Sequence, residues 1–256
     1  RMRLAASNLA WPSEHEAEAL QILRDNGFTG VEVAPTLIWP NWHGASPASA
    51  KEYAGKLRDQ GFEIPSLQSI VFGRPGLSVF GDLAAREELV SHLAHVAKLA
   101  SALGARILVF GAPKVRDRGR LTMAEALDNS AFTFRRVAEV CRNEGVRLCI
   151  EPNPPRYGCN FITTSQEGAQ LVGKVMHPGF GLHLDVSGMM LSGEVVPEAI
   201  RDLEGRFVHF HASEPDLADF DDPQAPHRAA GDALRSSFYE GWVSLEMRMQ
   251  EADPLR

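Results

Sequence analysis

The chain has 256 residues, of which 44% are hydrophobic and 23% charged, which is ordinary for a soluble globular protein. This length suits one α/β barrel or two small domains. The formal net charge of −7 disfavours a nucleic-acid-binding surface, because such surfaces depend on lysines and arginines that neutralise phosphates. The sequence contains no apolar run of about 18 residues and no signal peptide, so we expect a cytoplasmic protein without a membrane partner.

A glycine that follows an amphipathic run and precedes an apolar run recurs along the chain. The positions are Gly27, Gly61, Gly104, Gly145, Gly179, Gly205 and Gly241. A glycine just past a helix end adopts the left-handed conformation that caps the helix, so each one predicts a junction from helix to strand. These junctions, together with an opening strand over Met2–Ser7, predict eight strands.

Apolar residues at helical spacing predict the helices between these strands. The clearest helices are Glu14–Asn26, Leu83–Leu103 and Met123–Asn143. Ser46-Pro47 and Thr163-Thr164-Ser165 contain the residue types that begin helices. Strands that alternate with helices, without a long linker, predict a parallel sheet in one domain over residues 1–256. Eight such units in this length predict an α/β fold of the (β/α)8 TIM-barrel type.

The alternative architecture is a doubly wound open sheet. That fold usually places a glycine-rich phosphate loop after its first strand, but Asn8–Trp11 stands there in this chain. The barrel has one irregularity, because only ten residues, Met247–Arg256, follow the last predicted strand. We therefore expect the last helix to be short or missing.

The last four predicted strands each end on a residue that can bind a metal ion. These strands are Arg147–Glu151, Gly181–Asp185, Phe207–His211 and Trp242–Glu246. Side chains alternate along a strand, so each terminal residue should point into the barrel while the apolar residue before it packs against helices. Active sites of TIM barrels lie at the carboxyl ends of the strands. The sequence therefore predicts one metal site, with the ligands Glu151, Asp185, His211 and Glu246.

Three carboxylates and one imidazole form a ligand set made mostly of oxygen atoms. Such a set favours one divalent ion, Mn2+ before Mg2+, Co2+ or Zn2+, over a structural zinc site. A single carboxylate at a strand end is a solvated residue or a helix cap about as often as it is a metal ligand. A single buried histidine is more often structural than a ligand. The metal site is favoured because four such strand ends occur in succession.

Several short motifs are typical of one enzyme superfamily. They are Ile150-Glu151-Pro152-Asn153, His183-Leu184-Asp185, the segment Val208–Glu214, His227-Arg228 with Gly231, and the segment Gly241–Glu246. With these motifs the chain resembles the xylose isomerase-like TIM-barrel superfamily of sugar isomerases and epimerases. It is most similar in pattern to the branch that contains tagatose/psicose 3-epimerases and hydroxypyruvate isomerases. The resemblance implies that Glu151 and Glu246 bind the metal and exchange protons with opposite faces of a sugar-like substrate.

One stretch departs from the epimerase pattern. In that branch a histidine that contacts the sugar follows shortly after the position of Asp185. In this chain the stretch Val186–Met189 contains no histidine. The departure argues against the usual ketohexose as substrate.

Seven further residues are candidates to contact the substrate. They are Glu32, Trp39, Gln68, Asn153, His183, His209 and Arg228. Glu32 has the parity of an inward-facing strand residue, although a salt-bridged or surface position is equally compatible with the sequence. Trp39 lies in a short loop with Trp42, where two large rings would form an apolar wall or lid. Arg228 is suited to hold a substrate oxygen or carboxylate, or to neutralise the acidic segment Glu214–Asp222.

The leading hypothesis is a divalent-metal-dependent isomerase or epimerase of a small sugar or related polyhydroxy carbonyl compound, acting through an enediolate. A lyase of the inosose dehydratase type would use the same site, because both reactions begin with removal of a proton. An endonuclease IV-type nuclease would need several metals and a basic groove, which the net charge disfavours. A non-catalytic binding subunit is the fourth alternative. The sequence is compatible with a homo-oligomer.

Overall fold

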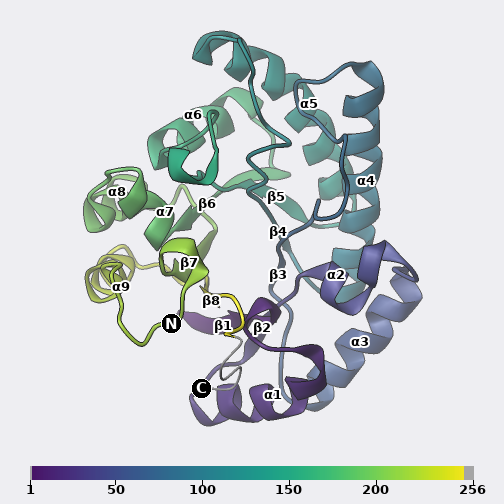
Figure 1. Cartoon of the computed structure of the whole chain (residues 1–256), viewed down its shortest axis with the longest axis vertical. Coiled ribbons are helices and arrows are strands. Elements are labelled where there is room, and N and C mark those ends of the chain that lie inside the picture. The colour runs from purple at the N-terminus through teal and green to yellow at the C-terminus, as the bar shows by residue number, and fades with distance from the viewer. Residues whose placement is uncertain (1, 251–256) are drawn as a thin grey trace.

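Eight parallel strands form the centre of the protein, and helices surround them (Figure 1). The computed structural model describes residues 2–250. The strands are β1 (Arg3–Ser7), β2 (Gly30–Glu32), β3 (Ser66–Leu67), β4 (Ile107–Phe110), β5 (Arg147–Ile150), β6 (Phe180–Asp185), β7 (His209–Ser213) and β8 (Trp242–Glu246). Their order in the sheet is β2-β1-β8-β7-β6-β5-β4-β3. Two isolated bridges, Gly30 with Glu63 and Val33 with Leu67, join β2 to β3 and nearly close the barrel. The predicted TIM-barrel fold is confirmed.

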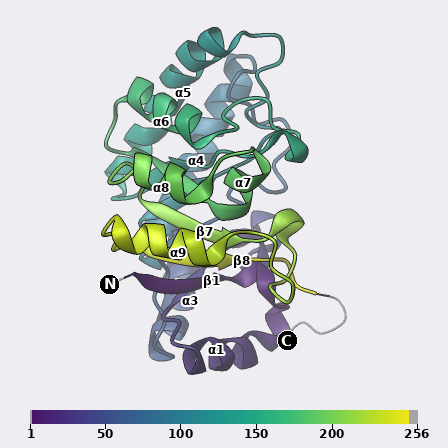
Figure 2. The same cartoon turned by 90° about the vertical axis from the view of Figure 1, so that its left-hand side faces the viewer.

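The helices alternate with the strands along the chain. They are α1 (Glu16–Asp25), α2 (Pro35–Ile38), α3 (Pro47–Asp59), α4 (Leu83–Leu103), α5 (Met123–Asn143), α6 (Ser165–Val175), α7 (Val186–Leu191), α8 (Val196–Asp202) and α9 (His227–Ser236). The bounds of α4 and α5 match their predicted ranges. The starts of α3 and α6 are also confirmed, because the side chains of Ser46 and Thr164 accept hydrogen bonds from backbone amides of the first helical turns. Figure 2 shows α9 in front of β8, and Figure 1 shows it on the outer side of the barrel next to α8.

Five of the seven predicted helix-capping glycines have the left-handed conformation. They are Gly27, Gly61, Gly104, Gly145 and Gly205. For Gly179 and Gly241 the prediction is wrong, because neither has a positive φ. A Cβ atom at Gly179 would lie 2.0 Å from the carbonyl oxygen of Ala138, and one at Gly241 would lie 2.3 Å from the hydroxyl of Tyr239. Glycine is needed at these two positions because neighbouring atoms leave no room for a side chain, and not because the backbone is left-handed.

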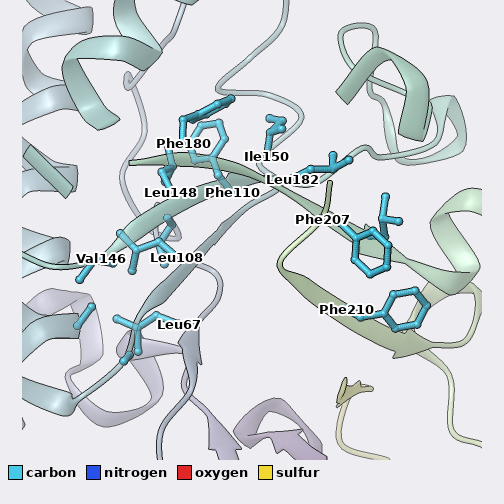
Figure 3. Packing of buried hydrophobic residues seen from close by; sticks show 14 of the residues in the cluster. Leu67, Leu108, Phe110, Val146, Leu148, Ile150, Phe180, Leu182, Phe207 and Phe210 are labelled. Carbon is cyan, nitrogen blue, oxygen red and sulfur yellow. The ribbon is translucent and has the colours of Figure 1, made fainter. Parts of the chain in front are cut away.

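Apolar side chains on the outer face of the barrel hold the strands against the helices (Figure 3). Phe134 of α5 lies between Phe110 of β4 and Phe180 of β6, with ring centroids 5.7 and 5.0 Å apart. Buried aromatic rings of this kind contribute strongly to the stability of a core. Because this packing fixes the strands relative to one another, it also fixes the height at which each inward-facing side chain lies.

The segment after β8 forms no helix over Met247–Gln250, as far as the structure describes it. Its backbone amides at Arg248 and Met249 donate to the carbonyl oxygens of Leu217 and Leu9. The prediction of a short or missing eighth helix also concerns residues 251–256, which lie outside the described part of the chain. Over residues 2–250 no helix has both the length and the apolar character needed to cross a bilayer.

Candidate metal centre and active site

The four predicted ligand side chains converge near the carboxyl ends of β5 to β8, although β7 does not end on His211 as predicted but continues to Ser213. One ligand atom from each of them lies within 4.8 Å of the others, and the four residues are Glu151, Asp185, His211 and Glu246. The strand register produces this convergence, since Asp185 pairs with His211 between β6 and β7 and Ser213 pairs with Glu246 between β7 and β8. Asp185 and His211 are buried, whereas the side chains of Glu151 and Glu246 remain 13% exposed. Two carboxylates therefore face solvent-accessible space and two ligand candidates lie beneath it.

His211 stands at the centre of the cluster. Its Nδ1 atom lies 3.1 Å from Oε2 of Glu246 and 3.5 Å from Oε1 of Glu151, but no described residue makes a well-aligned hydrogen bond with this nitrogen. Burial by itself lowers the pKa of His211, but the charges of Glu32, Glu246 and Glu151 outweigh it and raise the pKa well above its ordinary value. An unpartnered imidazole nitrogen among three carboxylates suits a cation.

Asp185 accepts hydrogen bonds from its own neighbourhood. The Ser213 hydroxyl donates to Oδ2 at 2.6 Å, and the Ser187 hydroxyl and the Gly188 amide donate to Oδ1. Burial, together with the charges of Glu151 and Glu246, raises the pKa of Asp185 to about 7. A divalent cation would relieve this mutual repulsion of the carboxylates, so the residues present fit such an ion.

Glu32 lies directly below this cluster and is fully buried. Its Oε1 atom lies 2.7 Å from Nε2 of His211, and its Oε2 atom lies 2.9 Å from Nε2 of His209 and accepts a hydrogen bond from Ser66. Burial would raise the pKa of Glu32, but His211 and His209 hold it well below its ordinary value. Glu32, His209 and His211 form a second group that could hold an ion. None of these three residues lines the cavity described below, so the four-residue cluster, two of whose carboxylates do line it, is the better candidate for a metal site.

A third group combines His183 with Glu151 and His211. Nε2 of His183 lies 3.3 Å from Oε1 of Glu151. Burial, assisted by the charge of His211, lowers the pKa of His183 to about 3. The imidazole is therefore neutral, and its contact with Glu151 is not an ion pair. It packs edge to face on His211, with ring centroids 4.1 Å apart, and so supports that ring from the side.

A cavity of about 920 Å3 opens above the cluster. Glu151 and Glu246 lie in its wall, and they are its only carboxylates among the lining residues that the structure describes. Gln68 also lines it and donates from Nε2 to Oε1 of Glu246 at 2.6 Å. The remaining wall comes mainly from residues 69–77, which belong to the loop after β3, and from residues 109–115, which form the end of β4 and the loop that follows it. A small molecule in this cavity would meet both glutamates.

The sequence matches the family described as xylose isomerase-like TIM barrel over residues 20–256. The chain belongs to this family. No curated protein sequence matches it at a significant level.

Several solved structures share the fold of this xylose isomerase-like barrel. The 3-keto-D-glucoside 4-epimerase YcjR from E. coli has a TM-score of 0.81 at 16% identity, covering 99% of this chain and 95% of that chain. D-psicose 3-epimerase from Clostridium cellulolyticum H10, solved with D-tagatose, has a TM-score of 0.79 at 20% identity, with coverage of 97% and 86%. The IolI protein with a bound zinc atom has a TM-score of 0.76 at 15% identity, with coverage of 96% and 89%. At these identities the likeness shows the fold alone.

The structure distributes the other predicted substrate residues unevenly around this family barrel. Gln68 reaches the cavity, whereas Asn153 lies behind Glu151 and donates to its Oε2 at 3.1 Å. Trp39 is buried in the hydrophobic core, and Arg228 is exposed near the start of α9, so neither lines the cavity. The remaining three predicted substrate residues, Glu32, His183 and His209, lie beneath the cluster.

Sequence reasoning missed four residues around the site. They are Ser66, Gly111, Arg116 and Ser213. Ser213 follows His211 by two positions on β7, so the alternation of strand side chains was a usable signal for it. Arg116 lies in an irregular loop after β4, where no periodicity points to it.

Proposed function

We propose that this xylose isomerase-like barrel is a divalent-metal-dependent isomerase or epimerase of a small sugar or related polyhydroxy carbonyl compound. Mn2+ is the ion that its oxygen-rich ligand set favours. Asp185 and His211 would hold the ion from below, and Glu151 and Glu246 would hold it from the cavity side. The observation that carries the proposal is that two carboxylates share one buried histidine and also face the same cavity.

Glu151 and Glu246 are suited to move protons. They come from β5 and β8, between which β6 and β7 intervene, so they approach the cavity from different sides. A carboxylate on one side of a substrate can remove the proton next to a carbonyl group, and one on the other side can return it. Such an exchange inverts the carbon centre, and return of the proton to the neighbouring carbon would give isomerisation instead. When bound, a divalent ion supplies Lewis-acid stabilisation of the enediolate charge.

Neighbouring side chains orient this pair. Asn153 donates to Glu151, and Gln68 donates to Glu246, so each glutamate has one oxygen fixed by an amide. The side-chain oxygen Oε1 of Gln68 is buried and has no hydrogen-bond partner among the described residues. We assign it as an acceptor for a substrate hydroxyl. The solved neighbours support the substrate class, because two of them are sugar epimerases by name.

Proton exchange in deuterated water tests the proposal. The protein is loaded with Mn2+ and incubated separately with D-tagatose, D-fructose, dihydroxyacetone and an inosose. NMR then follows loss of the proton next to the carbonyl and any new product. We expect exchange with at least one compound, reduced about a thousandfold in Glu151→Gln and in Glu246→Gln.

The matched control is Glu198→Gln, which changes an exposed glutamate on α8 and should leave exchange unchanged. Exchange that survives both active-site variants would contradict the assigned roles of the two glutamates. Release of water in place of an epimer or isomer would instead establish a lyase. No exchange with any of the four compounds by a protein that binds Mn2+ would reject the proposed function for this substrate class.

A further inference from the structure

We propose that Arg116 is a positioning residue, which fixes the orientation of the Glu151 carboxylate by acting through Asn153. The inference rests on the proposed role of Glu151 as ligand and proton carrier. It concerns a residue that touches neither the cavity nor the four-residue cluster. The evidence is a chain of directional hydrogen bonds that runs from a buried cation to the metal site.

Arg116 is fully buried in the loop after β4. Its Nη1 atom donates to the carbonyl oxygens of Gly111 at 2.7 Å and Phe110 at 3.3 Å. Its Nη2 atom contacts three acceptors, Oδ1 of Asn153 at 3.0 Å, the carbonyl oxygen of Ile162 at 3.2 Å and Sγ of Cys159 at 3.2 Å.

The charge of Arg116 has no direct counterion within residues 2–250. Over residues 2–250 no carboxylate forms an ion pair with it, although a buried charge is costly unless it is compensated. The carboxylate it reaches through a single intervening side chain is Glu151, with Asn153 between them. The arrangement is therefore an ion pair bridged by one amide group.

The bridge has a direction. A guanidinium group carries donors only, so Asn153 must turn its carbonyl oxygen toward Arg116. The amide nitrogen of Asn153 then faces the opposite way, where it donates to Oε2 of Glu151 at 3.1 Å. A flipped amide would place its NH2 against the guanidinium and its oxygen against the carboxylate, which makes both contacts repulsive. Arg116 therefore decides which atom of Asn153 meets Glu151.

The two oxygens of Glu151 consequently have different surroundings. Oε2 is held by Asn153 and lies close to Gly111, where a Cβ atom would be only 2.6 Å away. Oε1 points toward Nδ1 of His211 and Nε2 of His183, at 3.5 and 3.3 Å. With Oε2 anchored, Oε1 is the atom directed into the ligand cluster. Without Arg116 the amide loses its preferred orientation, and the carboxylate loses the anchor that sets its rotation.

A purely structural role would have a different consequence. Arg116 also ties the end of β4 to residues 159–162, so its removal should lower stability under either account. Arg118 provides the matched control, because its Nε atom donates to the carbonyl oxygen of Asn160 at 2.8 Å in the same loop without touching Asn153. Only the positioning role predicts that loss of Arg116 affects the metal site through Asn153.

A double-mutant cycle separates the two roles. Mn2+ dissociation constants are measured by calorimetry for the wild type, Arg116→Met, Asn153→Ala and the double variant, together with melting temperatures. We expect each single change to weaken Mn2+ binding about tenfold, and the double variant to be no weaker than the weaker-binding single variant. Arg118→Met should lower the melting temperature without changing the Mn2+ affinity. Losses that multiply in the double variant, or a wild-type affinity in Arg116→Met, would overturn the proposal.

A second readout needs no metal. The side-chain amide protons of Asn153 are followed by NMR in the metal-free wild type and in Arg116→Lys, which keeps the charge if Arg116→Met does not fold. We expect slow exchange with water in the wild type and at least tenfold faster exchange in the variant. Unchanged exchange would refute the positioning role. A wild type that binds no Mn2+ but shows the expected NMR change would reject the proposed function and leave the positioning role standing.

Discussion

Oε1 of Glu32 lies 2.7 Å from Nε2 of His211, at the bottom of the ligand cluster. A carboxylate on one nitrogen of a histidine fixes the ring orientation and directs the other nitrogen toward a metal. The opposite nitrogen, Nδ1, is the atom that faces Glu246 and Glu151. Glu32 therefore supports a ligand of the proposed metal site and does not line the cavity.

Replacing Glu32 by glutamine tests this relationship. The amide keeps the size of the side chain but removes the negative charge that lies 2.7 Å from Nε2 of His211. We expect the Mn2+ affinity, measured by calorimetry, to fall about 10- to 100-fold. The variant Glu63→Gln changes an exposed glutamate and should bind Mn2+ like the wild type. An unchanged affinity in Glu32→Gln would mean that the contact does not support the ligand.

Metal binding should depend on pH in a defined direction. A metal ligand must be deprotonated, yet the pKa of Asp185 is raised to about 7 and that of His211 well above its ordinary value. Below pH 7 the ion must therefore displace protons from these groups, so its affinity should rise with pH. We expect binding at least about tenfold tighter at pH 8 than at pH 6, with release of protons detected by calorimetry in buffers of different ionisation enthalpy. An affinity that falls or stays level over this range would contradict the assignment.

Adding even one methyl group at Gly111 should weaken metal binding. In Gly111→Ala the new methyl group would lie 2.6 Å from Oε2 of Glu151, so the carboxylate must move. We expect Mn2+ affinity to fall about tenfold or more while the circular dichroism spectrum is retained. Gly173→Ala is the matched control, since nothing lies within 4 Å of its Cβ position. Equal affinities for the two variants would show that the approach of Glu151 to this backbone is unimportant.

Replacement of Gly179, which lies away from the ligand cluster, should affect stability and not metal binding. A methyl group there would lie 2.0 Å from the carbonyl oxygen of Ala138 in α5, and a backbone atom cannot turn aside as a side chain can. We expect Gly179→Ala to lower the free energy of unfolding in urea by about 1–3 kcal/mol. If the variant is as stable as Gly173→Ala, the contact between Gly179 and the carbonyl oxygen of Ala138 is not close enough to exclude a methyl group.

Much of the fold was predictable because its signals are local and repeated. Helical periodicity gave the bounds of α4 and α5, and strand alternation gave the inward faces of β5 to β8. The same alternation brought the four ligand candidates together, because residues at the ends of neighbouring parallel strands share one edge of the sheet. These inferences needed only the residue types and their spacing.

Residue types and their spacing do not predict how far below the cavity an inward-facing side chain lies. Glu32 has the parity of an inward residue, but parity does not distinguish a layer beneath the ligands from the cavity wall. Arg116 gave no signal at all, because its contacts come from loops far apart in the sequence. The glycines at 179 and 241 follow the same helix-exit pattern as the others, yet they are needed for contacts that only the packed chain reveals.

The metal content of the purified protein, measured by elemental analysis beside Glu246→Gln, tests the proposed metal site most directly. Glu204→Gln, an exposed change, serves as the control. We expect about one divalent ion per chain in the wild type and the control, and markedly less in Glu246→Gln. Absence of metal from all three proteins, even after reconstitution with Mn2+, would contradict the metal site and with it the proposed proton transfer.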